Sequence, residues 1–446
     1  MRLLILDTDC NFLDIAMRAQ QYGHEVLVWN KPRKDGSHPR TGEGIIRRIR
    51  DFDTIRSRWI HWCDLLWLPD NTAYMEMLEP YRKLGFPIYG GSVASAQWEL
   101  DRAVGQKVME EAGLNIIPGK EFTDHDAAIK YVKKHGRPFV SKPSGNADKA
   151  MSYVADSAAD LVYMLGRWKQ NEKYRSDAKQ YGFIIQEKMI GCEMGVSGWF
   201  GPGGWCRYWE EDFEFKKLMD GDLGVNTGEQ GTLLRFVEES KLADVALKPL
   251  TKALEEIGYV GCVNVNGCID DTGDYWPYEF TMREGWPAKY NEIALMPGDP
   301  VQWMLDLVNG EDTMQCDTKN VSISVVVSIP EYPYSHLTAK ETEGYPIYGA
   351  GDSEHVHLCE VMLGEAPCQA GDKVVDMPCL QTAGDYVAVV TGTGENITSA
   401  RRSAYAAVKK IKIPNSPGYR LDIGRSKLVE NLGRIQKHGF ARGLSY

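Results

Sequence analysis

Residues 214–231 read Glu-Phe-Lys-Lys-Leu-Met-Asp-Gly-Asp-Leu-Gly-Val-Asn-Thr-Gly-Glu-Gln-Gly, and the other motifs of the chain are arranged around this stretch. It begins with an acid and two lysines and ends in a loop that contains four glycines. Because glycine has no Cβ, its backbone N–H group can approach an anion closely, and the lysines add positive charge. Asn226 and Thr227 add short side chains that can hydrogen-bond a carboxylate or phosphate oxygen. The stretch predicts an anion-binding loop, although glycine-rich loops are also typical of simple turns.

The composition indicates a folded, acidic protein. The chain has 446 residues, 43% of them hydrophobic, and a net charge of −11. This length suggests about three domains at roughly 150 residues each, and the charge argues against an electrostatic grip on duplex nucleic acid. No run approaches the ~20 apolar residues of a membrane span, and the first residues do not form a signal peptide. Ten cysteines without a Cys-x-x-Cys pair indicate reduced thiols in a cytoplasmic protein and no zinc site.

The first hundred residues show alternating strand and helix patterns. Apolar runs at 3–6 and 23–29 flank a helical pattern at 12–19, which predicts a βαβ unit with a right-handed crossover. Further strands are expected at 64–68 and 86–89, around a helix near 74–84. The sequence therefore predicts a small domain with a doubly wound parallel sheet.

Four motifs, in order, carry a resemblance to a known family. The order Asp220-x-Asp222-x-Gly224-x-Asn226-Thr227-Gly228-x-x-Gly231, behind an acid-x-Lys216, resembles the Asp-His-Lys-Arg…Asp-x-Asp-x-Gly-Pro-Asn-Thr-Gly-Gly-Met-Gly signature of phosphoribosylamine–glycine ligases. The stretches 89–102, 138–150 and 275–287 also resemble motifs of this family. These ligases are ATP-grasp enzymes of purine synthesis that join a carboxylate to an amine.

The resemblance covers almost the whole chain and implies an α/β fold with α+β parts. It implies an N-terminal Rossmann-like acceptor domain at 1–95 and an ATP-grasp core at 96–319 with a lid subdomain at about 118–190. A C-terminal β-rich domain at 320–424 and a helical tail at 425–446 complete the expected organisation. Pro249 is expected to kink or split the helical pattern at 242–257.

The resemblance also implies which residues contact ATP. Arg102 and Lys142 would meet the phosphates, the backbone around Glu187–Met189 would pair with the adenine edge, and Glu193 would accept from the ribose hydroxyls. Glu193 is also compatible with a solvated surface acid. The full set implied is Arg102, Lys142, Gly145, Lys149, Glu187, Lys188, Met189, Glu193, Lys216 and Gly228.

The cofactor implied beside ATP is Mg²⁺ or Mn²⁺. Glu279 matches the family's magnesium carboxylate, but Thr281 replaces the asparagine that normally shares the metals. A hydroxyl is a poorer oxygen donor than an amide, and Mg²⁺ needs hard oxygen ligands. We therefore hypothesise that Asn266, on the facing strand, or Glu284 compensates.

The implied reaction is the phosphorylation of a carboxylate by ATP, followed by attack of an amine on the acyl phosphate. Arg283 matches an anion-binding arginine that can fork onto the carboxylate and the acyl phosphate. Asn226, Thr227 and the backbone amides of residues 224–228 would hold the same group from the other side, and Lys216 is the fourth residue of the implied catalytic set. Glycine or a similar small amino acid is the expected donor.

The acceptor is left open by the sequence. The turn at 7–14 has no glycine, arginine or histidine where the family binds a sugar phosphate, and Asp7 and Asp9 would repel a phosphate. The basic segment at 31–50 could be a surface loop or could supply the missing charge. Three interpretations remain: a phosphoribosylamine–glycine ligase, the same chemistry with another amine such as a modified nucleotide, and a non-catalytic nucleotide-binding module. The expected partners are small molecules, and the protein is expected to be a monomer or homodimer.

Overall fold

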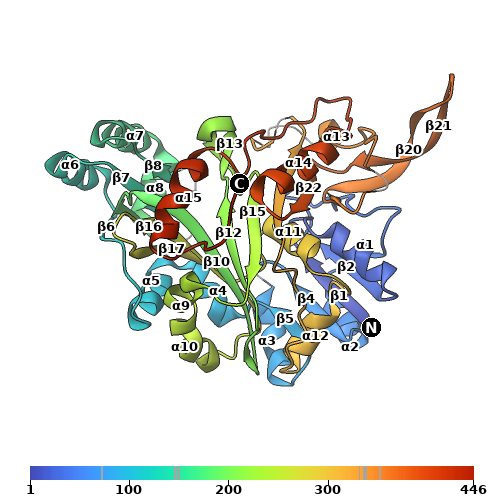
Figure 1. The fold of residues 1–446 in the computed structure, drawn as a ribbon, viewed down its shortest axis with the longest axis horizontal. Coiled ribbons are helices and arrows are strands. Elements are labelled where there is room, and N and C mark those ends of the chain that lie inside the picture. Colours follow the sequence, from blue (N-terminus) through green and yellow to red (C-terminus); the bar gives the residue numbers. More distant parts are fainter. Residues whose placement is uncertain (72–73, 145–146, 148–150, 331, 335–338, 351–352) are drawn as a thin grey trace.

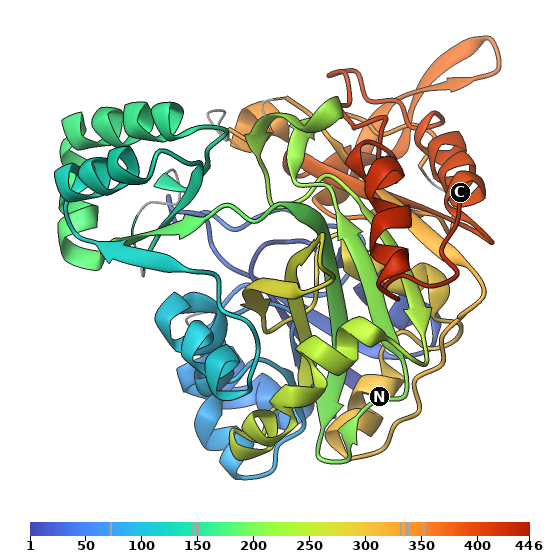
Figure 2. The same ribbon diagram turned by 60° about the vertical axis from the view of Figure 1, so that its left-hand side comes forward.

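A computed structural model describes residues 1–71, 74–144, 147, 151–330, 332–334, 339–350 and 353–446. Figures 1 and 2 show a broad central sheet, a smaller sheet with helices at one side, and a long hairpin that leaves the body at the other side. None of the helices formed by the described residues combines the length and the apolar character that a membrane crossing requires.

The N-terminal residues form a five-stranded parallel sheet of order β3-β2-β1-β4-β5. Its interior strands are almost wholly apolar, as expected for a parallel sheet that is covered on both faces. The predicted βαβ unit and the predicted parallel sheet are therefore confirmed. The elements are β1 (Arg2–Asp7), α1 (Leu13–Gln21), β2 (Glu25–Asn30), β3 (Arg48–Ile49), a π-helical turn (Ile55–Trp59), α2 (Ile60–Trp62), β4 (Leu65–Leu68), α3 (Met75–Lys83) and β5 (Ile88–Gly90).

The smaller sheet has the order β6-β9-β7-β8 and its own hydrophobic core (Figure 2). The two long helices of this part of the chain, residues 158–170 and 172–181, are divided at Asn171, whose side chain caps the second helix. The elements are β6 (Gly119–Phe122), α6 (His125–His135), β7 (Phe139–Pro143), β8 (Tyr153–Val154), α7 (Ala158–Gln170), α8 (Glu172–Tyr181) and β9 (Phe183–Glu187). Two helices, α4 (Val93–Leu100) and α5 (Arg102–Glu111), precede it.

The central sheet is antiparallel and runs β17-β16-β10-β12-β15-β18-β22-β19. Strands β18, β22 and β19, which come after residue 320, belong to the same hydrogen-bonded sheet as the strands before it. The sequence places a domain boundary at residue 320, and that division stays a prediction. The strands are β10 (Gly191–Gly201), β11 (Gly204–Trp205), β12 (Trp209–Glu214), β15 (Thr232–Val237), β16 (Gly261–Asp270), β17 (Tyr275–Thr281), β18 (Val321–Ser328), β19 (Val356–Leu358) and β22 (Tyr386–Gly394).

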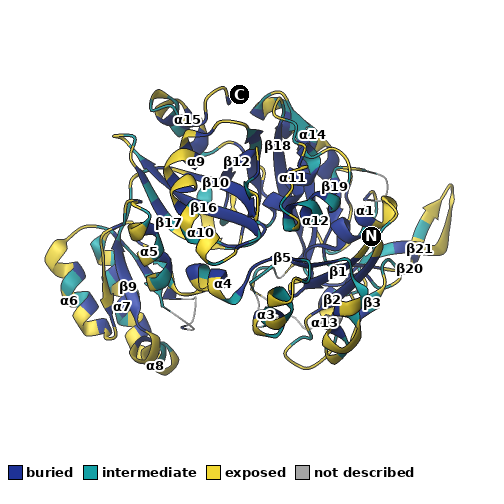
Figure 3. Ribbon diagram, turned by 90° about the horizontal axis from the view of Figure 1, so that it is seen from below, coloured by how far each residue is buried: buried dark blue, intermediate teal, exposed yellow. Residues whose placement is uncertain are grey.

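Helices cover both faces of this sheet. One face packs on α9 (Lys241–Ala246), α10 (Thr251–Glu256), α14 (Ile397–Val408) and α15 (Lys427–Lys437). The other face meets α11 (Ala288–Leu295), α12 (Gln302–Val308) and the N-terminal sheet. A short 3-10 turn at Lys248–Leu250 separates α9 from α10, which confirms the predicted break at Pro249. In Figure 3 the central strands are buried, whereas the outer sides of α6 and α8 are exposed.

The remaining elements are two hairpins and a short helix. β13 (Lys217–Met219) and β14 (Leu223–Asn226) flank a 3-10 turn, and β20 (Val361–Ala370) pairs with β21 (Lys373–Thr382) in the protruding hairpin of Figure 1. The short helix is α13 (Ala339–Thr342). The base of the β20–β21 hairpin binds residues 42–44: Gly42 N donates to Val361 O at 2.7 Å, and Leu363 N donates to Glu43 O at 2.8 Å. The 31–50 segment is thus docked against the C-terminal part of the chain.

Candidate active site

One face of the central sheet is polar along three neighbouring strands. Gly195 of β10 pairs with Asp212 of β12 and with Asn266 of β16, and Ser197 pairs with Glu210 and Asn264. Since side chains alternate along a strand, this row of acids and amides points to one face, while Met194 and its neighbours enter the core on the other. The sequence contains a signal for this face that none of our predictions used. Acids recur at every second position at 210, 212 and 214, and asparagines do so at 264 and 266.

Three cationic side chains and one acid from four separated segments meet at the end of this polar face. Arg102 Nη2 of α5 lies 3.3 Å from Glu279 Oε2 of β17. Loss of solvent would raise the pKa of Glu279, but the charges of Lys142, Lys216 and Arg102 outweigh this effect and hold that pKa at about 2. Loss of solvent lowers the pKa of Lys142 to about 8, although Glu279 opposes the shift. The structure therefore brings Arg102, Lys142, Lys216 and Glu279 into one electrostatic cluster.

Lys216 is held between two acids. Its Nζ lies 2.7 Å from Glu214 Oε2 and 3.3 Å from Glu193 Oε1. Burial would lower the pKa of Lys216, but Glu214, Glu193 and Glu279 raise it well above the ordinary value, so the ammonium stays charged. Asn266 Nδ2 donates to the same two carboxylates, at 3.0 Å to Glu193 and 2.5 Å to Glu214. The sequence did not single out the side chain of Glu214.

The predicted adenine hinge joins the smaller sheet to the central one. Glu187, at the end of β9, forms an ion pair with Arg137. Lys188 Nζ donates to Ala155 O at 2.8 Å and lies 2.9 Å from Asp156. Both side chains are therefore engaged within the smaller domain, and Met189 is half-buried in the link to β10. The predicted phosphate contacts Gly145 and Lys149 lie outside the described residues.

The loop after β14 is held by its own hydrogen bonds. Thr227 Oγ1 donates to Lys216 O at 2.9 Å and accepts from Gln230 Nε2 at 3.0 Å. Asn226 is exposed on β14, and a Cβ added to Gly228 would lie 4.0 Å from the Trp286 ring. The Thr227 hydroxyl thus shapes the loop, while the Asn226 side chain is directed to solvent.

Arg283 is anchored to the N-terminal side of the molecule by two acids that the sequence did not predict. Its Nε lies 3.1 Å from Glu99 Oε1 of α4 and 3.4 Å from Asp70 Oδ1 after β4, and its Nη1 donates to Glu284 O at 3.2 Å. Glu284 is buried and accepts from Lys289 at 3.0 Å and from Tyr89 at 2.5 Å. The Glu284 carboxylate is therefore committed to a different cluster from the one around Glu279.

The oxygen atoms around Glu279 fit a hard divalent cation. Asn266 pairs with Glu279 in the β16–β17 ladder, next to a bulge, and its Oδ1 is buried without a hydrogen-bond partner. Thr281 pairs with Asn264 one row further along. No group of three or more His, Cys, Asp or Glu side chains among the described residues is arranged to hold a metal ion, so a cation here would depend on Glu279, an amide oxygen and nucleotide oxygens.

The turn between β1 and α1 is acidic, and backbone N–H groups of the same turn occupy the carboxylate of Asp7. Asp7 accepts from the backbone of Asn11 at 3.1 Å and of Phe12 at 3.0 Å, and burial raises its pKa to about 7. Asp9 stands beside Asp70, and loss of solvent and that acid raise its pKa to about 6. These carboxylates line the ends of the strands next to Arg283.

Four arginines of the basic 31–50 segment are paired with acids. Arg33 lies 2.6 Å from Glu343, and Glu43 lies within 3.8 Å of three guanidinium groups, those of Arg40, Arg48 and Arg50. Among the described residues, Lys31 is the cation of this segment that acts on Asp9.

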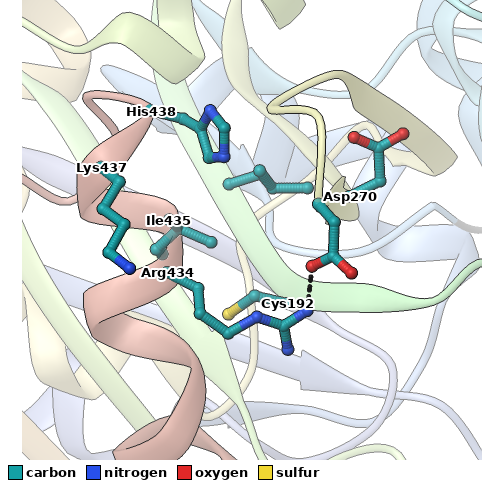
Figure 4. A pocket seen from close by; sticks show the side chains of 8 residues that line it. Cys192, Asp270, Arg434, Ile435, Lys437 and His438 are labelled. Atoms are coloured by element: carbon teal, nitrogen blue, oxygen red, sulfur yellow. Dashed lines mark hydrogen bonds and ion pairs between the residues drawn. The ribbon is translucent and has the colours of Figure 1, made fainter.

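A cavity of about 260 Å³ lies on the opposite face of the sheet, between α15 and the β16–β17 hairpin (Figure 4). Arg434 of α15 forms an ion pair with Asp271 at its edge. Cys192 lines this cavity, whereas its neighbour Glu193 faces Lys216, because successive side chains of β10 point to opposite faces. The cavity is thus separate from the Glu279 cluster.

The chain is similar to known proteins over most of its length. Residues 101–284 match the family described as phosphoribosylglycinamide synthetase, ATP-grasp (A) domain. The phosphoribosylamine–glycine ligase of Salmonella typhimurium is 24% identical over 371 residues, which are 80% of this chain and 81% of that protein. That of Methanosarcina barkeri is 27% identical over 360 residues, covering 78% and 77%.

Solved structures show the same fold. Phosphoribosylamine–glycine ligase from Thermotoga maritima superposes with a TM-score of 0.70 at 19% identity, covering 94% of this chain and 99% of that one. The biotin carboxylase domain of 2-oxoglutarate carboxylase from Hydrogenobacter thermophilus, solved with ADP and magnesium, has a TM-score of 0.61 at 12% identity, covering 94% and 91%. The chain is therefore similar in sequence and in fold to the phosphoribosylamine–glycine ligases, and its residues 101–284 match their ATP-grasp domain.

Proposed function

We propose that the protein is an ATP-dependent carboxylate–amine ligase that forms a C–N bond through an acyl phosphate. The observation that carries the proposal is the meeting of Arg102, Lys142 and Lys216 with Glu279, although these residues come from four separated segments. A polyphosphate is the ligand that such a group of fixed positive charges suits, and phosphoryl transfer needs positioning and charge stabilisation more than a protein nucleophile.

Each part of the nucleotide has its own proposed contacts. Lys142, Arg102 and Lys216 bind the phosphates, and Gly145 and Lys149, which lie outside the described residues, are proposed as further phosphate contacts. The backbone at Glu187–Met189 takes the adenine edge, and Glu193 takes the ribose. Residues 118–190 act as the lid.

A divalent cation supplies charge neutralisation of the transferred phosphoryl group when it is bound. Glu279 and the Oδ1 atom of Asn266 would hold it, with Thr281 as the weaker third candidate, because these residues offer hard oxygens at the end of the β16–β17 ladder. Mg²⁺ or Mn²⁺ is the proposed ion.

Arg283 is the proposed contact to the carboxylate of the donor and to the acyl phosphate. Glu99 and Asp70 hold its Nε, which leaves its Nη2 edge for a ligand. Gly228 and Asn226 would complete the binding from the loop after β14, and Thr227 keeps that loop in shape. We propose glycine as the donor, as in the relatives' name.

Two acceptors are proposed. Phosphoribosylamine is the first, from the relatives. An amine without a phosphate group is the second, and it is favoured by the closed turn with Asp7 and Asp9 and by the paired arginines of the 31–50 segment. Carboxylates at this place would repel a phosphate and attract an ammonium group.

The test is ADP release with ATP, Mg²⁺, glycine and one amine at a time. Turnover that depends on phosphoribosylamine supports the first acceptor, and turnover with an unphosphorylated amine supports the second. ADP binding without turnover under every mixture would overturn the ligase proposal. The substrates are proposed to be small molecules, and the ten free cysteines suit the cytoplasm that we propose as the location.

A further inference from the structure

The amide of Asn266 is held by Glu193 on the neighbouring strand β10 and by Glu214, which lies two strands away. Asn266 lies on β16 and Glu214 on β12, and β10 runs between them. Asn266 Nδ2 nevertheless reaches Glu214 Oε2 at 2.5 Å. Gly195 of β10 pairs with Asn266 on one side and with Asp212 on the other, so the Asn266 side chain passes the glycine diagonally to reach Glu214, two residues beyond Asp212.

Asn264, whose partner on β10 is Ser197, also reaches β12 diagonally. Asn264 Nδ2 crosses β10 to Asp212 Oδ2 at 3.2 Å and also donates to Ser197 at 3.0 Å. A Cβ added to Gly195 would lie 2.4 Å and 2.5 Å from the two carboxylate oxygens of Asp212. Gly195 is therefore the position that lets two asparagines reach the acids of β12.

The two carboxylates determine which way the Asn266 amide faces. An ionised carboxylate accepts hydrogen bonds only, so the NH₂ group of Asn266 must be the end that faces Glu214 and Glu193. The Oδ1 atom then points away from β12, toward the side where Glu279 pairs with Asn266, and it is buried without a partner among the described residues. An unpartnered carbonyl oxygen beside a carboxylate is a preformed ligand for a hard cation.

The same two acids also hold Lys216 at 2.7 Å and 3.3 Å. We propose that Glu214 is a positioning residue that fixes the amide of Asn266 so that Oδ1 meets the metal, and that holds the ammonium of Lys216 for the phosphates. The proposal rests on the proposed function, because it assumes that the metal and the nucleotide bind at this cluster.

The test measures Mn²⁺ binding in the presence of ADP by electron paramagnetic resonance. It compares the full-length protein with Glu214→Gln, Asn266→Ala and the double variant. Loss of a side chain that orients a metal ligand typically weakens metal binding about 10- to 100-fold, so Glu214→Gln should raise the Mn²⁺ dissociation constant by about that factor. Asn266→Ala should do the same. With ADP held at saturation for every variant, so that the Lys216 contact to the phosphates does not limit Mn²⁺ binding, the double variant should be no worse than Asn266→Ala, because Glu214 acts on the metal through Asn266.

Glu238→Gln is the matched control, since Glu238 is exposed and pairs with Arg207. If Glu214→Gln does not fold by circular dichroism, Glu214→Asp replaces it, because the aspartate keeps the charge but its side chain is one carbon atom shorter and no longer reaches Asn266 in the same way. An unchanged Mn²⁺ affinity in the Glu214 variant overturns the inference while the ligase proposal stands. A double variant whose loss is the product of the two single losses also overturns it. If the unaltered protein binds no Mn²⁺ with ADP, both proposals fail.

Discussion

Arg102 and Glu279 neutralise one another across 3.3 Å, and each is also a proposed ligand of something else. Glu279 would hold the metal, and Arg102 would hold a phosphate. Binding of the metal and the nucleotide together therefore replaces one internal ion pair with two external ones. Nucleotide alone would take Arg102 away from Glu279 and give Glu279 no cation in its place. The metal and the nucleotide should therefore bind cooperatively.

Glu279→Gln should have opposite effects on nucleotide binding with and without metal. In the presence of Mg²⁺ we expect ATP turnover to fall about 100-fold or more. The reason is that Glu279 is the proposed ligand of the metal ion that neutralises the transferred phosphoryl group. In the presence of a chelator we expect ADP to bind about two- to fivefold more tightly, the range of a partly exposed ion pair, because Arg102 is released. Isothermal titration calorimetry with ADP under both conditions measures this, with Glu238→Gln as the control. Equal weakening under both conditions would contradict the exchange of partners.

Lys142 should make ADP binding depend on pH. Its pKa is about 8 in the free protein, below the value of about 10.4 in an unfolded chain, and phosphates bind its charged form. ADP affinity should therefore fall about tenfold between pH 7 and pH 9. Lys142→Arg should remove this dependence, since a guanidinium stays charged throughout that range. An unchanged pH profile in the arginine variant would show that another group titrates.

Asp7 should make stability fall as the pH rises. Its pKa is raised to about 7 in the folded protein from an ordinary value near 3.8, so the folded state binds more protons between those limits. The free energy of unfolding should then decrease from about pH 4 to pH 7, by up to about 4 kcal/mol for this group. Asp7→Asn should flatten that slope in urea unfolding, whereas Asp372→Asn, in the exposed β20–β21 turn, should leave it unchanged. A slope that persists in the Asp7 variant would assign it to other acids.

Arg283→Lys should lower turnover without loss of ADP binding. The guanidinium is fixed by Glu99 through Nε, and a lysine cannot keep that bond while it also presents two donors to a carboxylate. We expect a decrease in kcat of about 100-fold, in the range seen when a fixed donor is removed. ADP affinity should stay within about threefold, since Arg283 lies outside the Glu279 cluster. A parallel loss of ADP binding would place Arg283 on the nucleotide instead.

The sequence predicted what depends on local pattern and on motif order. The βαβ unit and the break at Pro249 follow from periodicity and proline geometry over short windows. The approach of Lys142 to Glu279 follows from the order of the family's motifs. Each of these signals is contained in contiguous residues or in a known arrangement.

What the sequence did not predict depends on strand order and long-range contacts. Arg283 pairs with Glu99, 184 residues away, and Asn266 reaches Glu214 only because β10 lies between β16 and β12 and has Gly195 opposite Asn266. The order of strands in a sheet is not encoded in the periodicity of any one strand. For the same reason the pairing of β15 with β18, which joins the parts of the chain before and after residue 320, could not be anticipated.

Gly195→Ala should test the polar face directly. The added Cβ would lie 2.4 Å from Asp212 Oδ1. Asp212 is only 2% exposed and accepts a hydrogen bond from Asn264, so its carboxylate cannot move away from the new methyl group without disturbing Asn264. Overpacking of this kind costs about 1–3 kcal/mol, which urea unfolding would measure as a lower free energy of unfolding. Gly166→Ala is a matched control in α7, where nothing lies within 4 Å, and it should stabilise by up to about 1 kcal/mol because alanine favours a helix. Since the shift of Asp212 would also push on the contacts of Asn266, Mn²⁺ binding with ADP should weaken in the Gly195 variant and stay unchanged in the Gly166 variant. A Gly195 variant with full stability and full Mn²⁺ affinity would show that the asparagines do not need the open row on β10.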